Sequence, residues 1–355
     1  MTPTTYRTLD YPVHVGRGLL PSLSSIVPDI ARAHRIAVIT DDTVGPLYAD
    51  RIAAELGEDR SLLISLPPGE DQKTRMSWAQ ITDALLDARF GRDSLLIALG
   101  GGVIGDLTGF VAATYLRGVP FLQVPTTVLA MVDASIGGKT GVDTAHGKNL
   151  VGAFHPPVAV VADLDTLATL PLAERVNGLA EALKHGVICD AGYFDEVAAT
   201  DCATADWERI VGRSVEIKTG VVAADEREHG VRKTLNFGHT IGHAIEQLLH
   251  YAVPHGACVA FGMLVETRIA IAMGLCDQAL EPQLQQALVR FDFPVSIPVT
   301  LTPESIVDAT AGDKKRRSGA VEYALPSRCG AMAGAVRGYG TPVPRDVAIA
   351  ALLQA

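Results

Sequence analysis

The chain lacks a long apolar run. Its longest apolar stretch, residues 257–275, is interrupted by Glu266 and Arg268, so it falls short of the roughly 18 uninterrupted apolar residues of a membrane-spanning helix. Residues 1–18 include Asp10 and His14 and contain no apolar core, which argues against a secretory signal. We therefore expect a soluble protein without a membrane partner.

Paired cysteines and excess positive charge are also missing. The five cysteines form no CxxC pair, and their number is odd. This pattern argues against a zinc knuckle or a disulfide framework and favours free thiols in the reducing cytoplasm. The net charge of −10 argues against nucleic acid as the main partner. The basic residues are concentrated locally, which indicates a small anionic ligand.

The length and the hydrophobic pattern indicate two domains. A chain of 355 residues exceeds the usual size of a single hydrophobic core. Its first half alternates short apolar runs with helical patterns, which predicts parallel βαβ units of a Rossmann-like α/β domain that binds a nucleotide. The expected strands cover 35–40, 61–66 and 95–99, and the expected helices include 52–56 and 78–90.

The second half has a different pattern. Helical periodicity dominates from residue 172 to about residue 311, with one late strand-like segment at 321–325. We therefore predict an N-terminal α/β domain over residues 1–170 and a mainly α-helical domain over residues 171–355.

A glycine-rich segment follows the third expected strand. Residues 100–106 fit GxGxxG and stand between a strand and a helix, where glycines let the backbone approach a pyrophosphate and helix N-terminal amides meet its charge. The match is unusual, because the acid Asp106 follows at once rather than about twenty residues later. A plain glycine turn remains the alternative.

Other polar residues follow neighbouring strands. Glu70 and Lys73 come after the second strand and could hold ribose hydroxyls and phosphate, although a solvated turn would look the same. Thr126 and Thr127 end a further strand, and hydroxyls at the carboxyl ends of strands face the ligand crevice of an open α/β sheet.

A second glycine-rich region, residues 133–149, contains Lys139 and Lys148. It resembles the end of a P-loop, but GxxxxGK is absent, so we reject an ATPase. Anion binding is the favoured interpretation of its lysines. The basic run at 313–317 is interpreted as a loop that reaches a substrate phosphate, with a merely solvated loop as the alternative.

Three histidines and a glutamate form a candidate metal site. His239 and His243 have i, i+4 spacing on one helix, His255 stands at the start of the next, and Glu181 lies in an apolar helical segment. Two imidazoles and one carboxylate leave a fourth position open, as in catalytic Zn²⁺ sites. An isolated HxxxH is more often a surface or core pair. Here Lys184, Lys218, Arg232 and Asn236 stand close in sequence and suggest a phosphorylated or carboxylated substrate.

These segments together resemble the 3-dehydroquinate synthase family of the sugar-phosphate cyclase superfamily. The resemblance runs from about residue 11 to residue 325 and rests on motifs that occur in the expected order. They are 100–106, 113–118, 125–127, 133–141, 147–149, 178–184, 235–243, 255–256 and 313–315.

The resemblance implies an N-terminal NAD-binding domain and a C-terminal helical metal-binding domain. It also implies a reaction of the shikimate pathway to chorismate and the aromatic amino acids. A carbon–oxygen lyase converts 3-deoxy-D-arabino-heptulosonate 7-phosphate to 3-dehydroquinate and phosphate. The steps are transient oxidation by NAD, phosphate elimination, reduction and aldol cyclisation. A homodimer is implied as well.

The resemblance assigns residues to each task. Zn²⁺ or Co²⁺ is held by Glu181, His239 and His255, and His243 contacts substrate instead. The catalytic residues are Asp133, Lys139, Lys184 and His243. Lys218 and Arg232 hold the substrate carboxylate, whereas Lys139, Asn149, Asn236, His243, Lys314 and Arg117 of a second subunit hold its phosphate. Lys184 also contacts substrate. NAD is contacted by Asp42, Gly69, Glu70, Lys73, Gly102, Val103, Ile104, Gly105, Asp106, Thr126, Thr127, Lys139, Lys148, Thr166, Leu167 and Thr169.

Two points stay open within the family. Ala257 stands where many members have Glu, and either Lys314 or Lys315 could face the phosphate. The alternatives are a cyclase for sedoheptulose 7-phosphate or glucose 6-phosphate, which would not need both Lys218 and Arg232, and a metal-dependent NAD polyol dehydrogenase, which would release NADH. A non-catalytic binding module is a third alternative, disfavoured by the intact metal residues.

Overall fold

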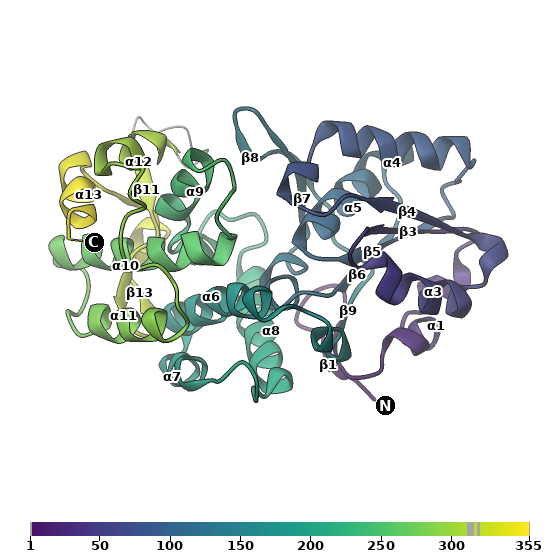
Figure 1. Cartoon of the computed structure of the whole chain (residues 1–355), viewed down its shortest axis with the longest axis horizontal. Helices are drawn as coiled ribbons and strands as arrows, with labels where there is room; N and C mark the ends of the chain where they lie inside the picture. Colours follow the sequence, from purple (N-terminus) through teal and green to yellow (C-terminus); the bar gives the residue numbers. More distant parts are fainter. Residues whose placement is uncertain (1, 311–315, 318–319, 355) are drawn as a thin grey trace. The chain divides into compact units, whose positions relative to one another are not determined.

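The computed structural model describes residues 2–310, 316–317 and 320–354. They form two compact units (Figure 1). Unit 1 comprises Met1–Arg175 and Asp206–Thr219, and unit 2 comprises Val176–Ala205 and Gly220–Ala355. Helices α6 (Leu172–Cys189) and α8 (Trp207–Ala224) each belong in part to both units. The domain limits expected from the sequence, 1–170 and 171–355, stay a prediction.

Unit 1 is built on a seven-stranded sheet in the order β1-β2-β9-β6-β5-β3-β4. Only β1 is antiparallel to its neighbour. The strands are β1 (Thr4–Tyr6), β2 (Val13–Gly16), β3 (Ile36–Asp41), β4 (Ser61–Leu66), β5 (Leu95–Gly100), β6 (Phe121–Pro125) and β9 (Ala159–Asp163). A separate antiparallel hairpin pairs β7 (Lys139–Thr144) with β8 (Gly147–Phe154).

Helices cover both faces of this sheet (Figure 1). On one side lie α4 (Arg75–Asp87) and α5 (Gly102–Thr114), and on the other lie α1 (Leu23–Ile26) and α3 (Gly45–Leu56). Residues 95, 97 and 99 of β5 pack with the helices at 23–56, whereas residues 96 and 98 pack with α4 and α5. Because side chains alternate across a strand, a strand covered on both faces must be apolar throughout. This explains the uninterrupted apolar sequence of β5.

The remaining helical segments of unit 1 follow in chain order. They are η1 (Leu20–Ser22), α1 (Leu23–Ile26), α2 (Pro28–Arg32), α3 (Gly45–Leu56), η2 (Glu58–Arg60), η3 (Glu70–Gln72), α4 (Arg75–Asp87), α5 (Gly102–Thr114), η4 (Tyr115–Arg117), the π-helical turn η5 (Ala130–Ala134) and η6 (Leu164–Ala168). The expected strands and helices of this half are thus present, and the Rossmann-like prediction is confirmed.

Unit 2 is mainly helical. After α6 come α7 (Ala191–Ala199), η7 (Val231–Asn236), α9 (His239–Leu248), α10 (His255–Ala272), α11 (Leu280–Arg290), α12 (Pro303–Thr310), η8 (Ala335–Arg337) and α13 (Arg345–Leu352). By length and composition alone, helix α10 could cross a membrane. However, 78% of it is buried inside the protein. Such burial is that of a core helix, which packs against α9, α11 and α13.

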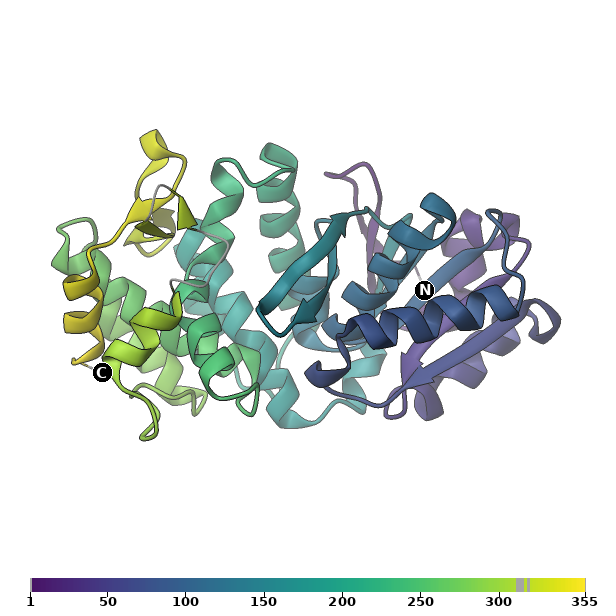
Figure 2. The same ribbon diagram turned by 90° about the horizontal axis from the view of Figure 1, so that it is seen from above.

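The expectation of a single late strand was wrong. Besides β11 (Ala320–Tyr323), the described part of unit 2 contains β10 (Arg316–Arg317), β12 (Pro326–Arg328), β13 (Ala331–Met332) and β14 (Thr341–Pro342). They form a three-stranded sheet β10-β11-β14 and a hairpin β12-β13. Figure 2 shows the late strands, in yellow, on one side of the helices of unit 2. Strands of two or three residues are too short for alternation to reveal them.

Candidate metal and cofactor sites

The polar residues assigned to NAD share one edge of the sheet. Asp42 follows β3, Gly69 to Lys73 follow β4, the glycine loop follows β5, Thr126 and Thr127 follow β6, and Thr166 to Thr169 follow β9. These five strands are parallel, so their carboxyl ends meet at the same edge. The chain order reverses between β3 and β5, and such a switch point opens a ligand crevice.

The glycine loop brings backbone close to this crevice. Gly101 is the N-cap of α5, and no side chain caps this helix terminus. A Cβ on Gly100 would lie 2.9 Å from Cβ of Ile104, and one on Gly102 would lie 3.2 Å from Cβ of Ala134. Only glycine therefore allows this turn to pack so tightly. The exposed amides of α5 fit a pyrophosphate, as the motif predicted.

Two ion pairs connect the other charged candidates. Lys73 Nζ lies 2.5 Å from Asp106 Oδ2, and Lys148 Nζ lies 2.9 Å from Glu70 Oε1. Asp143 N, on β7, donates to Lys73 O at 2.7 Å. Burial lowers the pKa of Lys73, but the carboxylates of Asp106, Glu70 and Asp143 raise it above its ordinary value. Lys73 is therefore a permanent cation beside the glycine loop.

The remaining NAD candidates differ in exposure, and Lys139 and Lys148 lie on the separate β7–β8 hairpin. Thr166 is buried and donates to Asp163 O at 2.7 Å, while Tyr48 bonds to both Thr169 Oγ1 and Thr166 O. Asp42 is exposed and accepts from Ser65 Oγ at 2.5 Å. Val103 is half-buried, Gly105 and Leu167 are buried, and Lys139 is exposed at the start of β7.

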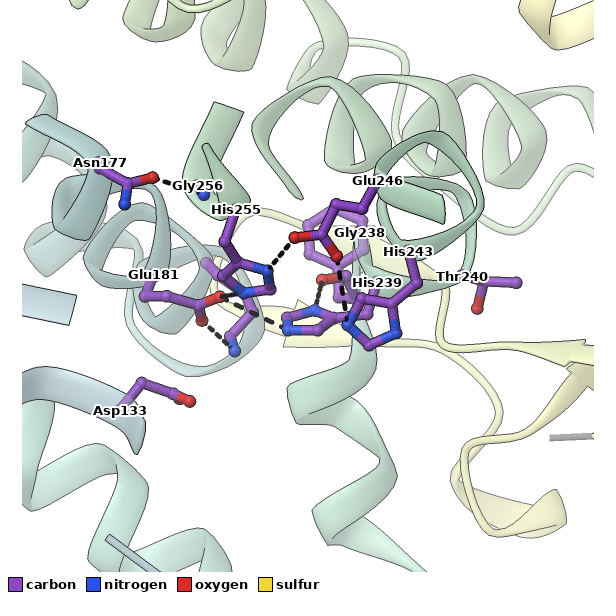
Figure 3. Close-up of polar contacts among 12 residues, drawn as sticks. Asp133, Asn177, Glu181, Gly238, His239, Thr240, His243, Glu246, His255 and Gly256 are labelled. Atoms are coloured by element: carbon purple, nitrogen blue, oxygen red, sulfur yellow. Dashed lines mark hydrogen bonds and ion pairs between the residues drawn. The ribbon is translucent and has the colours of Figure 1, made fainter. Parts of the chain in front are cut away.

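In unit 2, helices α6, α9 and α10 bring Glu181, His239 and His255 together (Figure 3). Glu181 Oε1 lies 3.5 Å from Nε2 of His239 and 3.3 Å from Nε2 of His255. All three ligand atoms lie within 4.8 Å of one another. In a tetrahedral site with metal–ligand bonds of about 2.0–2.1 Å, neighbouring ligand atoms lie about 3.3–3.4 Å apart. The two distances therefore fit two edges of such a site.

Hydrogen bonds direct both imidazoles toward Glu181. Nδ1 of His239 lies 3.1 Å from the carbonyl O of Phe237, and Nδ1 of His255 lies 3.0 Å from Glu246 Oε1. Because a carbonyl and an ionised carboxylate can only accept, each Nδ1 carries a proton, and Nε2 is the nitrogen that can bind a metal ion when a cation replaces its proton. Metal-binding histidines in proteins have this arrangement.

The surroundings of His255 favour a positive charge. Burial lowers the pKa of this imidazole, but the carboxylates of Glu246 and Glu181 raise it to about 10. A proton or a divalent cation can supply that charge, and the donor set suits Zn²⁺ or Co²⁺. Lys184, one helical turn after Glu181, forms an ion pair with the other oxygen of that carboxylate.

Two residues beside the metal candidates were missed in the sequence. Glu246 is buried, bonds to His255 and lies 4.0 Å from Nε2 of His243. Its spacing of three residues from His243 and seven from His239 places it on the same face of α9, which was a usable signal. Asn177 accepts from Gly256 N at 2.6 Å (Figure 3), and no sequence pattern indicated this contact.

The substrate candidates are spread over both units. In unit 1, Lys218 Nζ lies 2.8 Å from Asp133 Oδ2, Arg117 is exposed with φ 71°, and Asn149 has φ 53°. In unit 2, Arg232 is buried and donates to Glu226 O at 2.6 Å, and Asn236 Nδ2 donates to Glu228 Oε1 at 2.5 Å. Lys314 and Lys315 lie outside the described residues.

A Rossmann-like unit with an uncapped glycine loop, joined to a helical unit with a Glu-His-His cluster, defines a class of NAD- and metal-dependent enzymes. Within that class, the chain belongs to the 3-dehydroquinate synthase family. The family model of the N-terminal domain, 3-dehydroquinate synthase N-terminal, matches residues 63–177, and that of the C-terminal domain, 3-dehydroquinate synthase C-terminal, matches residues 178–316.

Individual relatives agree with this assignment. A 3-dehydroquinate synthase of Symbiobacterium thermophilum is 44% identical over 329 residues, covering 90% of this chain and 92% of that protein. The fold is similar to a 2-epi-5-epi-valiolone synthase from Streptomyces hygroscopicus with NAD⁺ and Zn²⁺ bound, at TM-score 0.87, 28% identity, and coverage of 100% and 99%. A 2-deoxy-scyllo-inosose synthase complexed with carbaglucose-6-phosphate, NAD⁺ and Co²⁺ has TM-score 0.88, 25% identity, and 99% coverage of each chain.

Proposed function

We propose that this chain is a 3-dehydroquinate synthase. It converts 3-deoxy-D-arabino-heptulosonate 7-phosphate to 3-dehydroquinate and phosphate in the shikimate pathway. The observation that carries the proposal is the cluster of Glu181, His239 and His255, whose Nε2–carboxylate distances of 3.5 and 3.3 Å suit a tetrahedral ion with one open position. The 44% identity to a 3-dehydroquinate synthase supports this substrate over the other sugar phosphates.

NAD and a divalent ion, Zn²⁺ or Co²⁺, are the cofactors of this reaction. When bound, the ion acidifies a substrate hydroxyl and polarises the ketone, and NAD accepts a hydride and returns it. Glu181, His239 and His255 hold the ion. The N-terminal amides of α5 would hold the NAD pyrophosphate. The other NAD contacts would come from the residues that follow β3, β4, β6 and β9 and from Lys139 and Lys148 of the β7–β8 hairpin.

The cationic candidates bind the two anionic groups of the substrate. Lys218 and Arg232 hold its carboxylate, and each is oriented by an oxygen of its own unit, Asp133 Oδ2 for Lys218 and Glu226 O for Arg232. The phosphate is held by Lys139, Asn149, Asn236, His243 and Lys314, with Arg117 of a second copy. Asp133 and Lys184 contact hydroxyls and position protons there.

We infer that the chain is a homodimer. Leu116, Leu150, Val151 and Phe154 are apolar and exposed in unit 1, at 36, 41, 36 and 42%. They lie on β8 and on the turn η4, which also contains Arg117. A bond of 2.9 Å between His155 Nε2 and Val119 O fastens the end of β8 near η4. Exposed apolar side chains on neighbouring segments can contribute to an interface between subunits.

The dimer has a direct test. Phe154→Glu places a charge on an exposed apolar position of β8, so we expect it to shift the mass measured by analytical ultracentrifugation to that of one chain. Leu353→Glu, an exposed leucine of unit 2, is the matched control and is expected to leave the mass unchanged. A dimer that survives Phe154→Glu would place the interface elsewhere.

The domain limits 1–170 and 171–355 and a cytoplasmic location are part of the same proposal. The biosynthetic role supports the cytoplasm, and so does the lack of a disulfide among the described cysteines. The domain limits are supported by the family models, which meet between residues 177 and 178.

The activity is tested with purified protein, heptulosonate 7-phosphate, catalytic NAD⁺ and Zn²⁺ or Co²⁺. Phosphate and NADH absorbance are followed together. We expect many turnovers of phosphate without net NADH and loss of turnover with EDTA. Phosphate release only from sedoheptulose 7-phosphate or glucose 6-phosphate would indicate another cyclase. Net NADH without phosphate would indicate a polyol dehydrogenase.

A further inference from the structure

Glu266 is a fully buried carboxylate in the middle of α10 that none of the motifs includes. Its Oε2 accepts a hydrogen bond from Gly238 N at 2.7 Å, and its Oε1 accepts from Thr240 N at 3.0 Å and from Ile241 N at 3.2 Å. These amides belong to the N-terminal turn of α9. A buried carboxylate is expensive unless it is bonded in this way, and a helix N-terminus stabilises its charge.

One of these bonds is connected to the metal candidate His239 through a single peptide group. The N–H of Gly238 and the C=O of Phe237 belong to the same peptide unit. The N–H donates to Glu266, and the C=O accepts from Nδ1 of His239. Hydrogen bonds in such a chain polarise one another, so the carboxylate strengthens the bond to Nδ1 and makes Nε2 a better electron donor. It also fixes the plane of the peptide that orients the ring.

The backbone around this peptide has little freedom to shift. Gly238 has φ +79°, and a Cβ there would lie 2.6 Å from Met263 Cγ and 2.7 Å from Val259 O. A Cβ on Gly262 would lie 2.0 Å from Gly238 O. Helices α9 and α10 are therefore in contact through backbone at the point where Glu266 bonds. This tight packing means that a shift of the Glu266 carboxylate would move the Phe237–Gly238 peptide and, with it, the ring of His239.

We propose that Glu266 is a positioning residue for the metal centre, acting on His239 through the Phe237–Gly238 peptide. Both metal-binding imidazoles are then supported by a buried carboxylate, His255 directly by Glu246 and His239 indirectly by Glu266. The inference rests on the metal site of the proposed function, but it does not depend on which sugar phosphate is the substrate.

The test compares metal affinity in Glu266→Gln and in wild type. The amide keeps the size of the side chain, but it loses the charge and turns an NH₂ group toward backbone N–H donors. Zn²⁺ and Co²⁺ dissociation constants are measured without substrate, by competition with a chromophoric chelator. We expect affinity to fall by about 10- to 100-fold, the usual cost of removing the hydrogen-bond partner of a metal ligand. We also expect an altered visible spectrum of the Co²⁺ form.

Glu281→Gln is the matched control. Glu281 accepts from Nε of Arg268, also on α10, at 2.7 Å, and the described structure gives it no bond to α9. It should lower the Tm of the metal-free protein and leave metal affinity within about twofold of wild type. A Glu266→Gln affinity equal to that of wild type, with only the Tm lowered, would overturn the proposal, because a merely structural role predicts that result.

A second measurement covers a poorly folding variant. Metal binding stabilises the folded protein by an amount that grows with the logarithm of affinity. The resulting increase in Tm is measured for Glu266→Gln and for Glu266→Asp, which retains the charge. A 10- to 100-fold loss of affinity reduces the metal-induced stabilisation by about 1.4–2.7 kcal/mol. An undiminished increase in both variants would overturn the proposal. If the wild-type protein bound neither metal, the proposed metal site itself would be wrong. If it bound metal but not the proposed substrate, the proposed function would be wrong and the role of Glu266 would be unaffected.

Discussion

The cofactor edge of unit 1 and the metal centre of unit 2 are built from different materials. The edge uses strand ends, glycines and the amides of α5, so most of its shape is backbone. The centre uses three side chains from α6, α9 and α10, each held by a buried polar partner. Backbone geometry depends on a few local residues, whereas side-chain geometry depends on contacts distant in the sequence. The two sites should therefore respond to different kinds of substitution.

The largest expected effect is on the metal centre. His255→Ala removes one of two imidazoles and leaves Glu181 and Glu246 without their shared cationic partner. We expect phosphate release to fall by on the order of 10³-fold or more, because the ion that acidifies the substrate is lost. Metal content by atomic emission should fall in parallel. The NAD⁺ affinity should remain at the wild-type value, and a parallel loss of NAD⁺ binding would contradict the separation of the sites.

The reverse experiment addresses the cofactor edge. Gly100→Ala places a Cβ 2.9 Å from Cβ of Ile104, and such overpacking costs about 1–3 kcal/mol. The first turn of α5 should move, and we expect NAD⁺ to bind about 5- to 100-fold more weakly, as measured by calorimetry, with unchanged Zn²⁺ affinity.

Gly220→Ala is the control for this substitution. Gly220 lies in α8, and a Cβ there would meet nothing within 4 Å. It should leave NAD⁺ affinity unchanged and slightly raise the Tm, since alanine favours a helix. If both variants weakened NAD⁺ binding equally, the tight packing of the loop would not be its cause.

Glu246→Gln should have an intermediate effect on the metal centre. The amide oxygen can still accept from Nδ1 of His255, which is 3.0 Å from Glu246 Oε1, but the negative charge is lost. We expect about 10-fold weaker Zn²⁺ binding, visible in chelator competition. Glu322→Gln removes a carboxylate that pairs with Lys233 at 3.1 Å in the same unit and should not alter affinity. Equal losses in the two variants would contradict a local role for Glu246.

The smallest effect concerns the loop before Arg232. Burial raises the pKa of Asp225, but hydrogen bonds from the amides of His229, Gly230 and Arg232 outweigh it and lower the pKa below the ordinary 3.8. A lowered pKa means that the carboxylate stabilises the folded state above pH 3.8 and that this contribution is lost as pH falls through the folded-state value. Asp225→Asn should therefore unfold at a higher pH than wild type in an acid titration followed by circular dichroism. Identical acid midpoints for the two proteins would show that the backbone hydrogen bonds to Asp225 do not stabilise the fold.

The strands and helices that form the cofactor edge could be predicted from the sequence because their signals are local, whereas the individual NAD contacts stay a prediction. The strands at 36–41, 61–66 and 95–100 are short and mostly apolar, and each is followed within a few residues by the turn that contains its NAD candidates. The metal candidates could also be recognised in the sequence, since His239 and His243 share a helix face and His255 begins the next helix. Glu266, by contrast, is 27 residues beyond His239 and has no spacing that connects it to α9. The short strands after β11 lacked enough residues to show alternation.

The sequence by itself determined the two kinds of unit, the order of the βαβ segments and the residue types that could bind NAD and a metal ion. These follow from periodicity and from chemistry that a side chain has wherever it is placed. Only the tertiary structure decided that Glu246 bonds to His255, that Glu266 bonds to the amides at the start of α9 and that Asn177 bonds to the start of α10. The physical reason is that a buried carboxylate or amide is stable only where several donors converge on it, and that convergence exists only after the helices have packed.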